Sequence, residues 1–211
     1  MSEESPQTVE LVQRAAAGDA DGWTDLVERY RDRLQRMVAV RIDRRMQQRV
    51  NSSDIVQEVY LEAAEHLAEY VADPKMPFFL WLRGITGNKL LEIHRHHLGV
   101  QKRDAARDVA IDGSASMQTT AAGLAAVLVG DATRPDEAAL KNEMRARLAE
   151  ALDALEPLDR EVLSLRHFEQ LTNAETATVL GIETSAASKR YVRALKRLKN
   201  VLTFSDDSLG P

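Results

Sequence analysis

Six basic side chains lie between Thr184 and Lys199, a stretch that contains no acidic residue. Lysine and arginine at this density are suited to binding phosphate groups. The chain of 211 residues has a formal net charge of -5, so this stretch is opposite in sign to the chain as a whole. A solvated surface helix usually mixes both signs, because Glu and Lys pair at i,i+4 spacing. The stretch therefore indicates a negatively charged partner outside the chain. Its basic residues are Lys189, Arg190, Arg193, Lys196, Arg197 and Lys199.

The residues around this stretch follow the pattern of a helix-turn-helix. Thr172 and Glu175 have the spacing of a capping box that opens a short helix. Gly181 is placed to end that helix in a left-handed conformation. A longer helix is expected to begin at Thr184 or Ser185. In this motif the second helix presents its first turns to base edges of duplex DNA.

Different parts of the second helix are expected to make different DNA contacts. Small polar side chains in its first turns let the backbone approach the groove, and Lys189 can reach a guanine edge. The later arginines are expected over phosphates, where they set affinity rather than sequence. The simpler alternative to DNA binding is a helical hairpin that packs on another protein and has a solvated basic face. Glu183, an acid at the helix entrance, has no explanation in the sequence. The predicted contacts are Thr184, Ser185, Ser188, Lys189, Arg190, Arg193 and Arg197.

Earlier in the chain, acidic residues repeat at i,i+3 and i,i+4 spacing. A capping box at Asp54 and Gln57 is expected to start a helix there. Like charges at this spacing repel and destabilise a helix. A basic partner would explain the arrangement, although a solvated acidic face is the simpler interpretation. The stripe consists of Asp54, Glu58, Glu62, Glu65 and Glu69.

The next segment, Phe78 to His97, mixes aromatic and basic residues. That mixture suits single-stranded or melted DNA, whose exposed bases need stacking partners. Phe78 and Trp81 are nevertheless expected in the core rather than as base platforms. The polar side chains that could donate to phosphates and bases include Arg83, Asn88, Lys89 and Arg95.

Helical spacing in nearly every periodic segment predicts an all-α fold. We expect two small helical domains, at 1–98 and 136–205, joined by a flexible linker at 99–135 and followed by a tail at 206–211. The linker is rich in Ala, Ser, Gly and Thr. The absence of cysteine excludes disulfides and thiolate sites. The N-terminus is unlike a signal peptide and the longest apolar stretch is too short to span a bilayer, so we expect a cytoplasmic protein without membrane insertion.

Taken together, the motifs resemble the extracytoplasmic-function (ECF) group of the sigma-70 family of RNA polymerase sigma subunits. SDIVQEVYLEA (Ser53 to Ala63) resembles the conserved second-region helix. FFLWLRGITGNKLLEIHRHH is similar to the segment that melts and reads the minus-10 element. LEPLDREVLSLRHFEQLTNAETATVLGIETSAASKRYVRALKRL (Leu155 to Leu198) resembles the fourth-region domain that binds the minus-35 element. The likeness covers both helical blocks in the order of the family.

The resemblance implies a role for each block. Asp54, Gln57, Glu58 and Glu62 would dock on core RNA polymerase, through the clamp helices of the beta-prime subunit. Arg83, Asn88, Lys89 and Arg95 would contact minus-10 DNA. The implied partners also include the beta flap of polymerase, promoter DNA and an anti-sigma factor or another regulator.

The resemblance implies no cofactor and no enzymatic activity. Two other classes of function make different demands on the sequence. A stand-alone helix-turn-helix regulator with a helical sensing domain would bind duplex DNA tightly without polymerase. An enzyme or metalloprotein would have to use His94, His96 and His97, but these lack carboxylates at ligand spacing. The expected function is therefore promoter-specific initiation of transcription, with no metal site.

Overall fold

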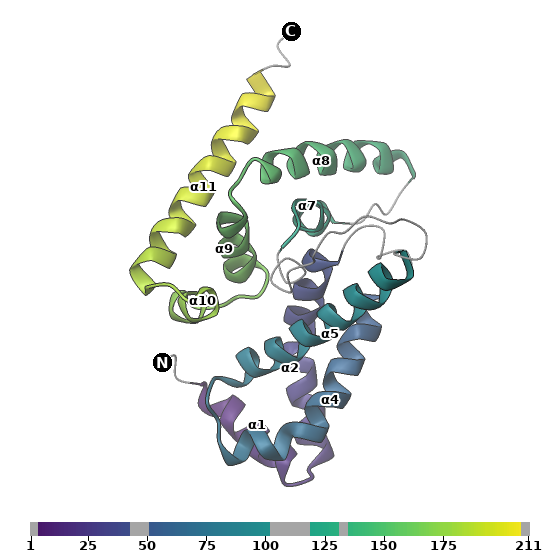
Figure 1. Ribbon diagram of the computed structural model, residues 1–211, viewed down its shortest axis with the longest axis vertical. Coiled ribbons are helices and arrows are strands. Elements are labelled where there is room, and N and C mark those ends of the chain that lie inside the picture. The colour runs from purple at the N-terminus through teal and green to yellow at the C-terminus, as the bar shows by residue number, and fades with distance from the viewer. Residues whose placement is uncertain (1–3, 43–50, 102–118, 131–134, 208–211) are drawn as a thin grey trace. The chain divides into compact units, whose positions relative to one another are not determined.

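The computed structural model describes residues 4–42, 51–101, 119–130 and 135–207 of the chain. These residues form helices and connecting segments, without any strand, which confirms the all-α prediction (Figure 1). The chain divides into two compact units. Unit 1 consists of Met1–Val38 and Gln48–Met117, and unit 2 of Ala39–Gln47 and Gln118–Pro211. The helices are α1 (Pro6–Ala16), α2 (Ala20–Arg41), α4 (Ser52–Ala72), α5 (Phe78–Gln101), α7 (Ala121–Val129), α8 (Pro135–Asp153), α9 (Pro157–His167), α10 (Asn173–Leu180) and α11 (Thr184–Asp207).

Helix α4 begins earlier than the sequence pattern predicted. Its N-cap is Asn51, whose side-chain oxygen accepts a hydrogen bond from the backbone of Ser53 at 3.0 Å. The predicted capping box at Asp54 and Gln57 is therefore wrong. Asp54 lies instead in the first turn, where a carboxylate stabilises the positive end of the helix dipole.

The core of unit 1 is formed by the apolar faces of α2, α4 and α5. Phe78 is almost fully buried at the start of α5, as predicted, and contacts Tyr30 of α2. Trp81 is only partly buried and stacks on Tyr70 of α4, with ring centroids 4.7 Å apart. The Tyr70 hydroxyl donates to the carbonyl of Met76 at 2.9 Å, which anchors the loop between α4 and α5. The buried apolar residues of this core include Leu26, Leu34, Val56, Val59, Leu67, Leu82 and Leu90.

The linker prediction missed a helix. Within the predicted 99–135 segment, α5 continues to Gln101 and α7 forms at Ala121–Val129, whereas 102–118 and 131–134 lie outside the described residues. Thr120 caps α7 by accepting a hydrogen bond from the backbone of Gly123 at 2.9 Å. A Cβ on Gly123 would lie 2.5 Å from the carbonyl oxygen of Val40. The small residues of this segment therefore allow α7 to pack closely on the end of α2. The same composition had led to the prediction of a linker.

Helix α7 contributes directly to the hydrophobic core of unit 2. Leu124 and Ala125 pack with residues from the end of α2 and from α8, α9 and α11. This packing explains why an Ala-rich segment of nine residues is helical, since a helix this short is marginal on its own. The other buried members of the cluster are Val40, Leu152, Leu155, Leu163, Phe168 and Ala194.

A buried group of charges lies beside this core. The Arg41 side chain is completely inaccessible, and its Nη2 is 2.5 Å from Oε1 of Glu161 and 2.5 Å from Oε1 of Glu169. The second oxygen of Glu161 accepts a hydrogen bond from the backbone of Thr119 at 2.9 Å. Burying charged groups is costly unless they are paired. This group therefore couples three separate segments of unit 2.

Candidate nucleic-acid and protein interfaces

The predicted helix-turn-helix is present in unit 2. The Thr172 hydroxyl accepts from the backbone of Glu175 at 3.2 Å, and the Glu175 carboxylate accepts from the backbone of Thr172 at 2.7 Å. This confirms the capping box that opens α10. Gly181 ends α10 with φ 62 and ψ 34, the left-handed conformation that was predicted. In Figure 1, α10 is followed directly by the long helix α11.

Gly181 and Gly84 are expected to respond in opposite ways to replacement by alanine. Gly181→Ala should lower the free energy of unfolding of unit 2 by about 1–2 kcal/mol, because a Cβ is strained in the left-handed region. Gly84 lies inside α5 with open space at its Cβ position, so Gly84→Ala should raise the stability of unit 1 by about 0.5–1 kcal/mol. Hydrogen exchange of the two units would measure both changes, and a stabilising Gly181→Ala would contradict the expectation.

The first turns of α11 are open to solvent on the side predicted to face DNA. Ala187 is completely buried in the same turns, so the helix has the expected inner and outer faces. The carbonyl of Glu183 accepts a hydrogen bond from the backbone of Ala187, which places Glu183 at the N-cap, and α11 begins at Thr184 as expected. A carboxylate at that end is favourable for the helix dipole. The exposed residues are Thr184, Ser185, Ser188 and Lys189.

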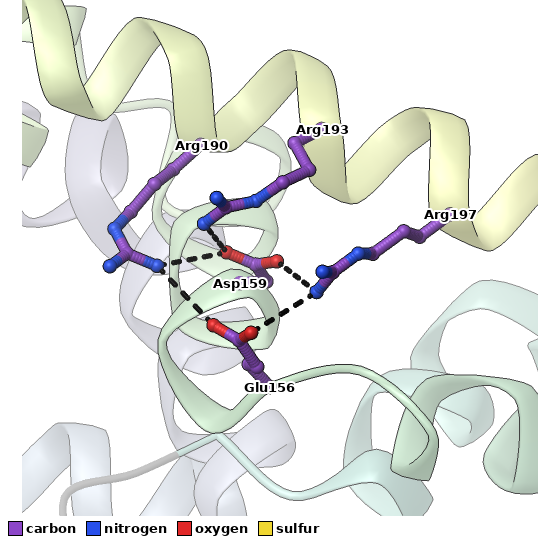
Figure 2. Close-up of polar contacts among 5 residues, drawn as sticks. All are labelled: Glu156, Asp159, Arg190, Arg193 and Arg197. Carbon is purple, nitrogen blue, oxygen red and sulfur yellow. Dashed lines mark hydrogen bonds and ion pairs between the residues drawn. The ribbon is translucent and has the colours of Figure 1, made fainter.

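The later arginines of α11 face α9 and bind two carboxylates there (Figure 2). We call Arg190, Arg193 and Arg197 the arginine cluster. Asp159 lies 3.2 Å from Arg190, 3.2 Å from Arg193 and 3.1 Å from Arg197. Glu156 makes longer contacts, at 3.6 Å to Arg190 and 3.4 Å to Arg197. The predicted phosphate contacts therefore already have protein partners.

The two carboxylates differ strongly in exposure. The side chain of Asp159 is 0% exposed, whereas that of Glu156 is 56% exposed. The hydrogen bond to Asp159 raises the pKa of Arg193 above its ordinary value. Sequence reasoning missed both acids, because their partners lie 31 to 41 residues further along the chain. An aspartate in the first turn of α9 looks locally like an ordinary helix-dipole residue.

In unit 1, the four predicted docking residues lie together on α4. We define the acidic surface as Asp54, Gln57, Glu58 and Glu62; the first three are exposed and Glu62 is half-buried. Leu61, which the sequence reasoning missed, lies among them with 67% of its area exposed. Single exposed apolar side chains are common on protein surfaces, so Leu61 by itself does not identify a contact point.

The predicted DNA-contacting residues of unit 1 all lie on α5, where their environments differ. Asn88 and Arg95 are exposed, and Arg83 is half-buried. Lys89 binds Glu58 of the acidic surface at 2.9 Å and Glu92 at 3.3 Å. The hydrogen bond to Glu58 raises the pKa of Lys89. The structure thus ties one predicted DNA contact to one predicted docking residue.

The described residues contain neither a metal-binding cluster nor a membrane-spanning helix. No three His, Cys, Asp or Glu side chains in that part of the chain gather in a way that could hold a metal ion. His97 belongs to α5, but its side chain lies outside what is described. None of the helices in the ranges given above combines the length and apolarity needed to cross a bilayer.

Comparison with known proteins gives a consistent set of similarities. Residues 145–198 match the family described as Sigma-70, region 4. The chain is 28% identical to the ECF RNA polymerase sigma factor SigD of Mycobacterium tuberculosis over 197 residues, covering 93% of this chain and 84% of that protein. It is 27% identical to the ECF RNA polymerase sigma factor BldN of Streptomyces coelicolor, over 94% of this chain and 67% of that protein. A solved structure of CnrH in complex with the cytosolic domain of CnrY shares the fold, with a TM-score of 0.55 and 24% identity over 93% of this chain and 97% of the other.

Proposed function

Because this chain belongs to the extracytoplasmic-function group of the sigma-70 family, we propose that it binds core RNA polymerase and directs initiation at promoters defined by minus-10 and minus-35 DNA. The helix-turn-helix carries this proposal. Its second helix, α11, presents small polar side chains and Lys189 to solvent in its first turns, as a major-groove reading helix requires. That motif lies within the segment that matches sigma-70 region 4.

We assign the remaining contacts to unit 1. The acidic surface on α4 would bind the basic clamp helices of the beta-prime subunit, and α5 would contact minus-10 DNA through Arg83, Asn88, Lys89 and Arg95. In the first assignment the exposed side chain of Leu61 would add an apolar contact beside the charged residues. The beta flap of polymerase would be a second contact, and an anti-sigma factor or another regulator would limit access to these surfaces.

The proposed activity requires no active site in this chain. Contacts with polymerase and with two DNA elements would offset the cost of unstacking minus-10 bases, which is a few kcal/mol per flipped base. Because both units belong to one chain, binding of one to a promoter raises the effective concentration of the other. We place the protein in the cytoplasm, where it would meet polymerase and promoter DNA.

Reconstituted transcription tests this function directly. Purified full-length protein is added to core polymerase together with a promoter library, and the transcripts are sequenced. We expect transcripts from a defined subset of promoters that share two elements. A protein that does not bind core polymerase but binds free duplex tightly would instead be the stand-alone regulator considered above.

The selected promoters also allow a test of the minus-35 contacts. Lys189→Ala should reduce discrimination against a substituted guanine in the minus-35 element by about 1–3 kcal/mol, because a base-specific contact is lost. Lys196→Ala, in a later turn of α11, removes the same charge from an exposed position. It should weaken binding about equally for every sequence. Equal loss of discrimination by both variants would contradict the assignment of Lys189.

A further inference from the structure

The arginine cluster is built on a single buried carboxylate. Asp159 is completely inaccessible, yet each of its oxygens lies within hydrogen-bond distance of at least one guanidinium group (Figure 2). Oδ1 is shared by Arg190 and Arg193, and Oδ2 is bound by Arg197. One anion therefore holds three cations in place, and the group keeps an excess of positive charge even when Glu156 is included.

The contacts leave most of each guanidinium group available for a second anion. Each arginine uses one terminal nitrogen toward the carboxylates: Nη1 of Arg190, Nη2 of Arg193 and Nη1 of Arg197. A guanidinium carries five N–H donors in a rigid fork. The three side chains remain partly exposed, between 30% and 45%. Their remaining donors can therefore bind an anion that approaches from solvent.

The spacing of the arginine cluster places three like charges beside one another. Arg190, Arg193 and Arg197 follow one another at i+3 and i+4 on one face of α11. Like charges at these separations repel and would spread the side chains apart. Asp159 removes this repulsion and holds each side chain in one orientation.

We propose that Asp159 is a positioning residue for DNA binding, which holds the arginine cluster ready to contact phosphates of the DNA backbone. This inference rests on the proposed function, in which α11 binds duplex DNA. Glu156 has a weaker effect: it is exposed at the edge of the cluster and makes only the longer contacts, to Arg190 and Arg197. The carboxylate contacts persist in the DNA complex, and the phosphates bind the unused N–H donors.

Two opposing effects decide what happens when Asp159 is neutralised. Removing a negative charge close to the DNA-binding surface strengthens attraction to phosphates. Losing the carboxylate also frees Arg193 and leaves Arg190 and Arg197 with only their longer contacts to exposed Glu156, so these side chains must be ordered when DNA binds. Because three arginines lose their buried partner and only one charge is removed, the loss of order is expected to outweigh the gain in attraction.

The test measures binding of the full-length protein to a fluorescein-labelled duplex by anisotropy over a range of salt concentrations. We expect Asp159→Asn to bind about tenfold more weakly than wild type. The slope of log affinity against log salt should become less steep by about 1 or more, because fewer phosphates are neutralised. Glu156→Gln is the matched control, since it removes the same charge from the same cluster. It should bind about two- to threefold more tightly. Asp159→Asn binding as tightly as Glu156→Gln would overturn the proposal.

The salt dependence separates positioning from a general defect in folding. A partly unfolded variant lowers the competent fraction by the same factor at every salt concentration, so its slope equals that of wild type. Weaker binding by Asp159→Asn with an unchanged slope therefore counts against positioning.

A measurement on the wild-type protein keeps the test independent of variants. On addition of duplex, the NMR signals of the arginine Nε–H groups of the cluster should shift, while the carboxyl carbon of Asp159 keeps its chemical shift. Release of Asp159 on DNA binding would show that phosphate displaces the carboxylate, which contradicts the proposal. Failure of the proposed function shows elsewhere: the wild-type protein then either does not bind core polymerase in the transcription experiment or shows no salt-dependent binding to the duplex.

Discussion

Reversing the charges of Asp54 and Glu58 together is expected to abolish binding to core polymerase. Both side chains are exposed on α4, so the substitutions Asp54→Lys and Glu58→Lys change the surface rather than a core. Placing like charges across an interface costs several kcal/mol. The affinity for core polymerase should therefore fall by about 100-fold or more.

The local consequences of this double substitution are expected to be small by comparison. Glu58→Lys breaks the ion pair with Lys89, but the Glu58 side chain is more than half exposed and such a pair contributes at most about 1 kcal/mol. Circular dichroism should show an unchanged helix content. Binding of duplex DNA through α11 should also be retained, because that helix belongs to unit 2.

A matched control for the same change in charge is available elsewhere in unit 1. Glu10 and Glu28 are exposed residues of α1 and α2, outside the acidic surface. Glu10→Lys combined with Glu28→Lys should leave polymerase binding within about threefold of wild type, apart from a general change in association rate. Biolayer interferometry with immobilised core polymerase measures all three proteins. Equal affinity of the Asp54/Glu58 variant and wild type would refute the docking assignment.

Replacing Arg41 by alanine is expected to cause the largest loss of stability of any single change considered. The substitution leaves Glu161 and Glu169 buried without their cation, and breaking a buried ion pair in this way costs about 3–5 kcal/mol. Burial lowers the pKa of Arg41, but the charges of Glu169 and Glu161 outweigh this and raise it overall. The arginine is therefore always charged in the folded protein.

Arg14→Ala is the control, because Arg14 also forms an ion pair but at the surface. Its Nε is 2.7 Å from Asp19, and the two side chains are 41% and 35% exposed. Removing such a pair should cost at most about 1 kcal/mol. Hydrogen exchange of the α9 amides measures the effect of Arg41→Ala, because α9 carries Glu161. If Arg41→Ala lowers the free energy of unfolding measured at α9 by no more than Arg14→Ala lowers it at α1, the buried charges do not have the stabilising role assigned to them.

Local features of the fold could be predicted from the sequence because they depend on residues a few positions apart. The capping box of Thr172 and Glu175 and the left-handed Gly181 involve neighbours within one turn, and both were found as expected. Helical periodicity likewise predicted the all-α fold. The start of α4 was missed because Asn51 and Asp54 are both good capping residues and nothing local distinguishes them.

The runs of charge determined, from the sequence alone, which surfaces are candidates for DNA and for polymerase. The tertiary structure decided what those charges meet inside the protein. Asp159 reaches the arginine cluster across 31 to 38 residues, and Arg41 reaches Glu161 across 120. The tertiary structure also decided that α7 is a helix, since the packing of Leu124 and Ala125 on distant elements stabilises it. Periodicity reports only neighbours on the same helix, whereas a buried charge depends on partners that folding alone brings within hydrogen-bond distance.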